Sequence, residues 1–171
     1  MDILVREALE DDVDWILALN AANVPDVGGL TLETYLALED QCHAVLIAED
    51  ASGERLGMIM LVAPGHDYDS VNYRWFEEKL NNFLYVDRVM VAEAGRRKGV
   101  GLALYSEALE MAEAQGAENL TAEVNVTPPN PTSMAFHERL GFAKMGEQDT
   151  PGGKSVAMLC RKTLYPEGQA T

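Results

Sequence analysis

The sequence predicts one α/β (α+β) domain in which helices pack on the faces of a mixed β-sheet. The 171 residues match the usual length of one domain, roughly 100 to 200 residues. Hydrophobic residues make up 47% of the chain and charged residues 24%, which is enough apolar content to build a folded core. Alternating runs typical of strands are interleaved with runs whose apolar residues recur every three or four positions, as they do in helices.

The N-terminal segment predicts one strand followed by two amphipathic helices. The alternating stretch Ile3 to Ala8 indicates the strand. Asp11 and Asp12 come next, and short acidic residues favour the N-terminus of a helix. The segment Val24 to Leu30, with its proline and two glycines, interrupts the first helix, so we expect a second helix over Leu32 to Leu38.

The next segment predicts three strands and a connection. His43 to Ala48 and Arg55 to Ala63 are β-prone runs separated by the turn-forming residues Asp50 to Gly53, and they predict a hairpin. A longer connection, Asp67 to Asn82, carries four aromatic residues, and we expect a short helix within it. Phe83 to Val91 is the fourth predicted strand.

A long amphipathic helix is predicted from about Arg96 to Gln115. Gly116 follows it, and glycine is the residue type that most often ends a helix. The apolar residues that recur at helical spacing are Leu102, Tyr105, Leu109 and Ala112.

Three strands and one further helix complete the predicted fold. Leu120 to Val126 alternates as a strand. Asn130 precedes Pro131, a pair that opens helices, and we expect this helix to stop at Gly141. The last two predicted strands are Phe142 to Glu147 and Ser155 to Arg161.

Charge and composition exclude several classes of protein. Twenty-eight acidic residues against 13 basic residues leave a net charge of -15, which would repel a nucleic-acid backbone. The longest apolar run, Met58 to Ala63, is far shorter than the ~20 residues of a membrane-spanning helix, and the N-terminus lacks the pattern of a secretory signal. Cys42 and Cys160 lack metal-binding or redox spacing, so we expect reduced thiols in a cytoplasmic protein with neither nucleic-acid nor membrane partners.

One short segment concentrates positive charge, and we name it the cationic turn (Arg96 to Gly101). It comprises Arg-Arg-Lys followed by Gly-Val-Gly, at the predicted junction of a strand and a helix. Glycines let backbone N–H groups approach a ligand closely, and a helix N-terminus carries about half a positive charge. The cationic turn therefore predicts a phosphate-binding site, with a solvated basic turn as the alternative.

Standard nucleotide-binding motifs are not met. Leu104 stands where the dinucleotide pattern G-x-G-x-x-G needs its third glycine, and the P-loop pattern G-x-x-x-x-G-K-[ST] does not occur in the sequence.

The cationic turn resembles the acyl-CoA pyrophosphate loop of the GNAT superfamily of N-acetyltransferases, which has the pattern [RQ]-x-x-G-x-[GA]. Arg96, Gly99 and Gly101 fill its three fixed places. The stretch Asn130 to Phe142 resembles the family's second signature, an Asn that opens a helix ending in Gly-Phe. The order of elements also agrees with the family over roughly Ile3 to Lys162. The resemblance implies a mostly antiparallel mixed sheet of six to seven strands with about four helices, in which the fourth and fifth strands splay apart.

The resemblance also implies where acetyl-CoA, the expected co-substrate, would bind. It would enter the cleft between the two splayed strands. Backbone groups of Val89 and Val91 would pair with its pantetheine arm like an added strand, and Asn130 would lie near it. We expect no metal, because the three histidines are scattered along the chain. The residues expected to bind the pyrophosphate are Arg96, Arg97, Lys98, Gly99, Val100 and Gly101.

Two residues are the candidates for proton transfer, His137 and Asp87. Many members of the family have a tyrosine at the position of His137 that protonates the departing thiolate, and an imidazolium with a pKa near 6.5 is competent to do the same. Packing between helix and sheet is the alternative role. Asp87 interrupts an apolar strand and is the leading candidate to deprotonate the acceptor amine, unless Arg88 is its structural partner. Glu123 in the next strand is a second candidate, or part of a polar face.

The acceptor is indicated only by charge and aromatic content. Residues 1 to 50 contain twelve acidic side chains and a single basic one, Arg6, so an anionic rim would attract a cationic amine or simply keep the protein dissolved. The aromatic segment Tyr68 to Phe76 fits an acceptor pocket, a homodimer contact or core packing.

The sequence therefore predicts an acetyl-CoA-dependent N-acetyltransferase. Its acceptor would be the primary amine of a small molecule or peptide, attacking directly in a ternary complex. A non-catalytic acyl-CoA-binding module, or transfer of a longer acyl chain, are the alternatives.

Overall fold

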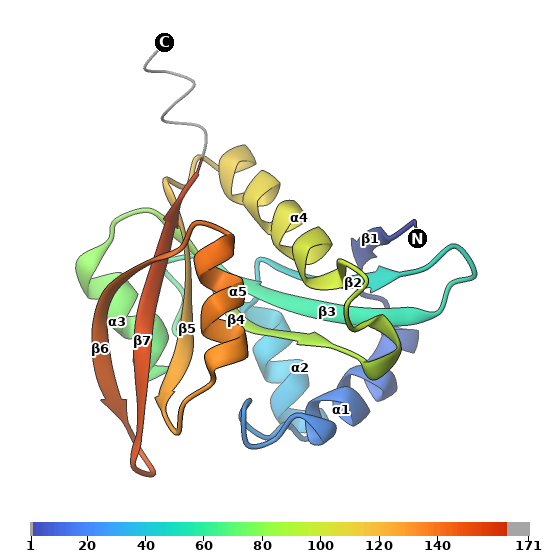
Figure 1. Ribbon diagram of the computed structural model, residues 1–171, viewed down its shortest axis with the longest axis horizontal. Coiled ribbons are helices and arrows are strands. Elements are labelled where there is room, and N and C mark those ends of the chain that lie inside the picture. The colour runs from blue at the N-terminus through green and yellow to red at the C-terminus, as the bar shows by residue number, and fades with distance from the viewer. Residues whose placement is uncertain (1, 164–171) are drawn as a thin grey trace. The chain divides into compact units, whose positions relative to one another are not determined.

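The computed structural model describes residues 2–163. Over this range the chain forms seven β-strands, five α-helices and two short 3-10 helices (Figure 1). Each predicted strand and helix is present, with ends that differ by a few residues. The strands are β1 (Leu4–Glu7), β2 (Ala44–Glu49), β3 (Arg55–Val62), β4 (Phe83–Val91), β5 (Asn119–Thr127), β6 (Ala143–Thr150) and β7 (Lys154–Lys162). The helices are η1 (Glu10–Asp12), α1 (Val13–Ala22), α2 (Leu32–Gln41), α3 (Val71–Lys79), η2 (Glu93–Gly95), α4 (Val100–Ala114) and α5 (Pro131–Arg139).

The strands form a mixed sheet in the order β1-β2-β3-β4-β5-β7-β6. The pairs β1-β2, β2-β3, β5-β7 and β6-β7 are antiparallel, whereas β4 and β5 are parallel. The register of β4 with β5 covers only Phe83–Tyr85 against Asn119–Thr121, although each strand is 9 residues long. The predicted fold class, a mostly antiparallel mixed sheet of six to seven strands flanked by helices, is confirmed, with five α-helices where about four were expected.

The described residues divide into two compact units. The first comprises residues 2–62 and 87–108, and the second comprises residues 63–86 and 109–163. Strand β4 and helix α4 each begin in one unit and end in the other. The two units are described separately below.

The first unit is built around β2 and β3, whose residues are buried along nearly their whole length. Two-sided burial explains why these strands are continuous apolar runs rather than alternating ones. Within this unit, Figure 1 shows α1 and α2 on one side of the two strands and the first turns of α4 on the other. Helices α1 and α2 contribute buried apolar side chains, namely Val13, Ile16, Tyr35 and Leu38.

The second unit has an aromatic core between α3 and the first half of β4. Tyr73 and Phe76 of α3 are fully buried, and so is Phe83 of β4. The Tyr73 ring meets the rings of Phe83 and Tyr85 edge to face, with centroids 5.9 and 5.7 Å apart. Of the three roles that the sequence allows for the aromatic segment, core packing is therefore the one that Tyr73 and Phe76 fulfil.

Helix α4 departs from its prediction at its first turn. It begins at Val100 rather than at Arg96, because Arg97 and Gly99 have positive φ angles of 62° and 81°, which no helix allows. The prediction that Leu102 lies on the apolar face of this helix is wrong. Leu102 is 54% exposed, and Leu104 is buried instead. With 15 residues α4 is the longest helix in the described range, where no helix is long and apolar enough to cross a bilayer.

Candidate functional site

The cationic turn joins η2 to the first two residues of α4 in the first unit. All four residues from Arg96 to Gly99 are exposed, and Val100 is the first residue of α4. The φ of Gly99, 81°, is one that L-amino acids rarely adopt, and a Cβ built there would meet no heavy atom within 4 Å. The backbone conformation, rather than crowding, therefore explains this glycine.

The cationic turn offers hydrogen-bond donors to solvent. No hydrogen bond between described residues uses the backbone N–H of Arg97, Lys98 or Gly99. The carbonyl oxygen of Gly99 accepts from the N–H of Ala103 (3.0 Å), which opens α4. Donors at the positive end of a 15-residue helix, next to three cationic side chains, have the charge and hydrogen-bonding capacity that a phosphate group requires.

Two glycines that the sequence analysis missed hold the cationic turn close to β3. A Cβ on Gly57 would lie 2.8 Å from Cγ1 of Val100 and 2.9 Å from the carbonyl oxygen of Met90. A Cβ on Gly95 would lie 2.7 Å from the carbonyl oxygen of Leu56. Only glycine permits these approaches. A glycine inside an apolar strand, as Gly57 is, was the signal that could have found the first of them.

The other residues expected at the acyl-CoA site lie in different units. Val89 and Val91 are partly exposed at the end of β4, in the first unit with the cationic turn. The strand ends where Ala92 N–H donates to the carbonyl of Leu56 (2.8 Å). Asn130 lies in the second unit and caps α5, because its side-chain oxygen accepts from the N–H of Ser133 (3.2 Å).

His137 is buried in the second unit, with 3% of its surface exposed. Its ring meets those of Phe136 and Phe142 edge to face, and Nδ1 lies 2.8 Å from the carbonyl oxygen of Ser133. A carbonyl only accepts, so we assign the proton to Nδ1 and the lone pair to Nε2. Burial lowers the pKa of His137 below its ordinary value of 6.5. The neutral ring therefore accepts at Nε2, and it must take up a proton before it can donate one there.

Asp87 forms an ion pair with its neighbour in β4. Its side chain is 4% exposed, and Oδ2 lies 2.8 Å from Nε of Arg88. Nη1 of Arg88 donates to Oδ1 of Asn20 (2.8 Å) and to the carbonyl of Gly28 (3.0 Å). The cationic partner that the sequence named as the alternative to a catalytic role is thus present. Through it, Asp87 belongs to a network that ties β4 to the end of α1 and the segment after it.

Polar side chains from three other elements of the second unit form a hydrogen-bond network with Glu123. Its Oε1 accepts from the hydroxyl of Tyr85 on β4 (2.8 Å) and from Nδ2 of Asn72 on α3 (3.2 Å). Oδ1 of Asn72 accepts in turn from Nε2 of Gln148 on β6 (2.9 Å). The sequence analysis named Glu123 but missed its partners, because they lie 25 to 51 positions away along the chain and no local pattern connects them.

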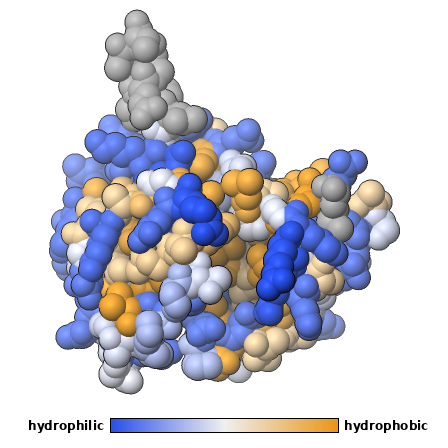
Figure 2. Space-filling model, viewed as in Figure 1, coloured by the Kyte–Doolittle hydropathy of each residue, from blue (hydrophilic) through white to orange (hydrophobic). Residues whose placement is uncertain are grey.

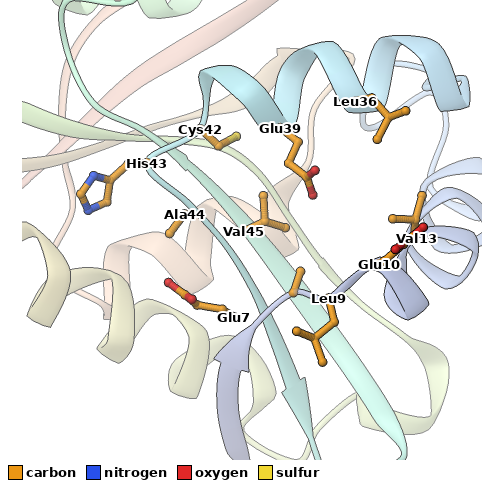
Figure 3. A pocket seen from close by; sticks show the side chains of 11 residues that line it. Glu7, Leu9, Glu10, Val13, Leu36, Glu39, Cys42, His43, Ala44 and Val45 are labelled. Carbon is orange, nitrogen blue, oxygen red and sulfur yellow. The ribbon is translucent and has the colours of Figure 1, made fainter.

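An open cavity of about 550 Å³ lies in the first unit, between α2 and the adjoining ends of β1 and β2 (Figure 3). Glu7, Glu10 and Glu39 bring three carboxylates to its lining, and Oε2 of Glu39 accepts from the hydroxyl of Tyr35 (2.9 Å). Three of the twelve acidic side chains in the first 50 residues therefore line this cavity. The other lining residues are Ala8, Leu9, Val13, Leu36, Cys42, His43, Ala44 and Val45.

The two cysteines are free thiols. Burial first, and then the negative charge of Asp87, raise the pKa of Cys42 to about 12, and burial raises the pKa of Cys160. Both thiols therefore stay protonated and unreactive near neutral pH. Within residues 2–163, no group of three or more His, Cys, Asp or Glu side chains is placed to hold a metal ion.

Comparisons with known proteins agree on one family. The chain matches the model of the acetyltransferase (GNAT) family over residues 12–142, a range that includes parts of both units. Two curated relatives are the L-methionine sulfoximine/L-methionine sulfone acetyltransferases of Pseudomonas aeruginosa and Pseudomonas paraeruginosa. Each is 28% identical over 164 residues, which covers 90% of this chain and 88% of the relative.

Solved structures of low identity share the fold. The phosphinothricin acetyltransferase from Sinorhizobium meliloti, solved in complex with AcCoA, matches with a TM-score of 0.72 at 21% identity, covering 95% of this chain and 89% of that one. Ard1 from Thermoplasma volcanium matches with a TM-score of 0.76 at 18% identity, covering 96% and 99%.

Proposed function

The chain belongs to the acetyltransferase (GNAT) family, and we propose that it transfers the acetyl group of acetyl-CoA to the amino group of a small amino acid. It is an N-acetyltransferase, as the sequence predicted. L-Methionine sulfone and L-methionine sulfoximine are the first acceptors to test, because the two curated relatives are named for them.

The cationic turn is the observation that carries the donor side of the proposal. It combines three cationic side chains with exposed N–H donors at the start of α4, which fits a pyrophosphate group. Arg96, Arg97, Lys98, Gly99, Val100 and Gly101 would hold that group. Backbone groups of Val89 and Val91 would pair with the pantetheine arm, and Asn130 would lie near it. When bound, acetyl-CoA supplies a thioester whose carbonyl carbon an amine can attack.

For proton transfer we propose Asp87 as the base and His137 as the acid. The Arg88 ion pair fixes the orientation of the Asp87 carboxylate, so that a proton from the acceptor ammonium would arrive at a positioned group. His137 would donate from Nε2 once that nitrogen is protonated, and the proton would end on the departing thiolate. Positioning the amine against the thioester contributes more to the rate than either group, on the order of 7 to 11 kcal/mol as effective molarity.

We also propose that the two compact units form one catalytic domain. The family match across parts of both units supports this. Thermal unfolding followed by fluorescence and by circular dichroism should then give coincident transitions. Separate transitions for the two probes would contradict a single domain.

Two measurements test the proposed function. Acetyl-CoA at hundreds of micromolar should raise the melting temperature, whereas NADH should not, because only a ligand bound to the folded state stabilises it. A thiol-release assay over amino acids, polyamines and short peptides should then identify the acceptor. Tight acetyl-CoA binding with no turnover on any amine would instead support a non-catalytic acyl-CoA-binding module. Longer acyl-CoA donors in the same assay would define the acyl range.

A further inference from the structure

The cavity between α2 and the adjoining ends of β1 and β2 is formed by residues that the proposed acetyl transfer does not use. All its lining residues lie between Glu7 and Val45, so the cavity belongs to the first unit alone. They include no residue of β4, β5, α5 or the cationic turn. The volume of about 550 Å³ is within the range of pockets that hold small organic ligands, roughly 300 to 1,000 Å³.

The cavity has an apolar floor and apolar walls. Val13 of α1 and the β2 residues Ala44 and Val45 line it and are buried. Figure 3 shows Leu36 on α2 and Leu9 on the facing segment after β1. These two leucines are 46% and 63% exposed, respectively. A ligand with an apolar body would remove part of this surface from water, which is favourable.

The charge on the cavity lining is negative. Glu7, Glu10 and Glu39 contribute carboxylates, and no lysine or arginine is among the lining residues. His43 is the only lining side chain that can gain a positive charge, so the lining stays negative even when that imidazole is protonated. The sign of the charge therefore favours a cationic ligand over a neutral or anionic one of the same shape.

The three carboxylates keep their charge available to a ligand. None of them forms an ion pair with another residue in the range 2–163. Arg6, a cation on β1, pairs instead with Asp12 and Glu49, at 2.8 and 3.0 Å. The hydroxyl of the fully buried Tyr35 donates to Oε2 of Glu39 (2.9 Å). A neutral donor orients a carboxylate without cancelling its charge, so a cationic ligand would supply a counter-charge that the described residues do not provide.

We propose that this cavity binds a small organic cation with an apolar body, at a site made of other residues than those proposed for acetyl transfer. The cationic group would lie among the carboxylates of Glu7, Glu10 and Glu39. The apolar body would lie against Leu9 and Leu36. A concave site with an apolar floor concentrates the field of its charges, so a cation is attracted here more strongly than to an open acidic surface. The inference does not depend on the proposed function, because none of these residues takes part in it.

Calorimetric titration with three compounds tests the class of ligand. Benzylguanidinium combines a cation with an apolar body, and its protonated guanidinium is not a nucleophile that could accept an acetyl group. Benzylurea has nearly the same shape without the charge, whereas methylguanidinium has the charge without the apolar body. The Kd of benzylguanidinium should be at least about ten-fold lower than that of either other compound. Equal affinity for benzylurea, or no binding of benzylguanidinium at millimolar concentration, overturns the proposal.

Glu39→Gln tests where the cationic group lies. The variant keeps the size of the side chain and an oxygen for the Tyr35 hydroxyl, and removes one negative charge. Glu33→Gln is the matched control, because it removes the same charge from an exposed position of α2 that does not line the cavity. The Kd of benzylguanidinium should rise about three-fold or more in Glu39→Gln, as expected for a solvent-exposed charge pair, and stay unchanged in Glu33→Gln. Equal effects of the two variants would indicate attraction by net charge alone and overturn the proposal.

Leu36→Ala tests where the apolar body lies, with Leu32→Ala as its control. Both leucines are exposed on α2, at 46% and 53%, but only Leu36 lines the cavity. Because both side chains are exposed, both variants should fold, which circular dichroism would check. The Kd of benzylguanidinium should rise about three-fold or more in Leu36→Ala only, since part of an apolar contact is lost. An unchanged Kd in Leu36→Ala would place the ligand elsewhere and overturn the proposal, even if Glu39→Gln failed to fold.

Discussion

Asp12 lies at a helix N-terminus, as the sequence predicts, and is also the centre of a buried ion-pair network. It directly precedes α1, and its side chain is 1% exposed and forms ion pairs with Arg6 (2.8 Å) and Arg55 (2.7 Å). Its Oδ2 also accepts from the N–H of Leu9 (2.6 Å). The hydrogen bond from Arg6 is the largest cause that holds the pKa of Asp12 far below its ordinary 3.8, with further lowering by Leu9 and Arg55. Asp12 thereby links β1, η1 and β3.

Asp12→Asn should therefore destabilise the fold. Removal of one partner from a fully buried pair costs about 3 to 5 kcal/mol, and we expect about 2 kcal/mol here because both arginines are partly exposed. The folded carboxylate has a lowered pKa, so its contribution is fully present above about pH 4 and declines as the pH falls further. Urea unfolding at pH 7 and at pH 3 should show the difference between variant and wild type shrinking at low pH. Asp14→Asn, an exposed control in α1, should leave the free energy of unfolding unchanged at both pH values.

His137→Phe tests the acid role under the constraint that the structure imposes. Burial lowers the pKa of His137, so its protonated fraction, and with it any acid catalysis, falls as the pH rises through a value below 6.5. The variant should have a lower kcat at acidic pH, an unchanged KM for acetyl-CoA, and no His-dependent decline of kcat with rising pH. If kcat depends on pH in the same way in the wild type and in His137→Phe, His137 has no acid role and only packs against Phe136 and Phe142.

Gly99→Asp should weaken acetyl-CoA binding by placing an anion within the cationic turn. Gly99→Asn is the matched control, because asparagine has the same shape, tolerates a positive φ better than most residues and carries no charge. Calorimetry should give a Kd for acetyl-CoA at least about ten-fold higher for the aspartate variant than for the asparagine variant. Raising the salt concentration should narrow that gap, since the effect is electrostatic. Equal affinities would remove the cationic turn from the cofactor site.

At the scale of elements, the packing of α3 against β6 depends on one glycine. Gly146→Ala would place a Cβ 2.9 Å from the Trp75 ring, and the rigid indole cannot yield without moving α3. We expect a loss of about 1 to 3 kcal/mol in the free energy of unfolding, measured by urea denaturation. Gly29→Ala adds the same group in open space and should cost little. A Gly146→Ala variant as stable as the wild type would show that α3 is not held at this contact.

Helix α4 shows why element ends are harder to predict than elements. Its helical spacing and the glycine after it were visible in the sequence, and Gly116 has the positive φ of 78° that a terminating glycine adopts. The start of its first turn could not be predicted from the sequence, because Arg97 takes a left-handed conformation that local propensity disfavours. The apolar face shifted accordingly, from Leu102 to Leu104.

At the scale of the whole chain, the net charge acts oppositely on a cationic acceptor and on an anionic donor. The net charge of -15 attracts a cationic acceptor and repels an anionic donor. The face shown in Figure 2 is largely hydrophilic, with scattered hydrophobic residues between. Against this background, the three cationic side chains of the cationic turn would supply the local positive charge for the proposed pyrophosphate site.

The sequence by itself determined the order of strands and helices, the caps at Asn130 and Gly116, and the glycine pattern of the cationic turn. These features depend on periodicity and backbone conformation, which neighbouring residues control. Only the tertiary structure decided the surroundings of Asp12, Asp87, His137 and Glu123. Their hydrogen-bond partners lie up to 51 positions away, such as Asn72 for Glu123. Burial and hydrogen bonding between such distant residues arise only when the chain has folded.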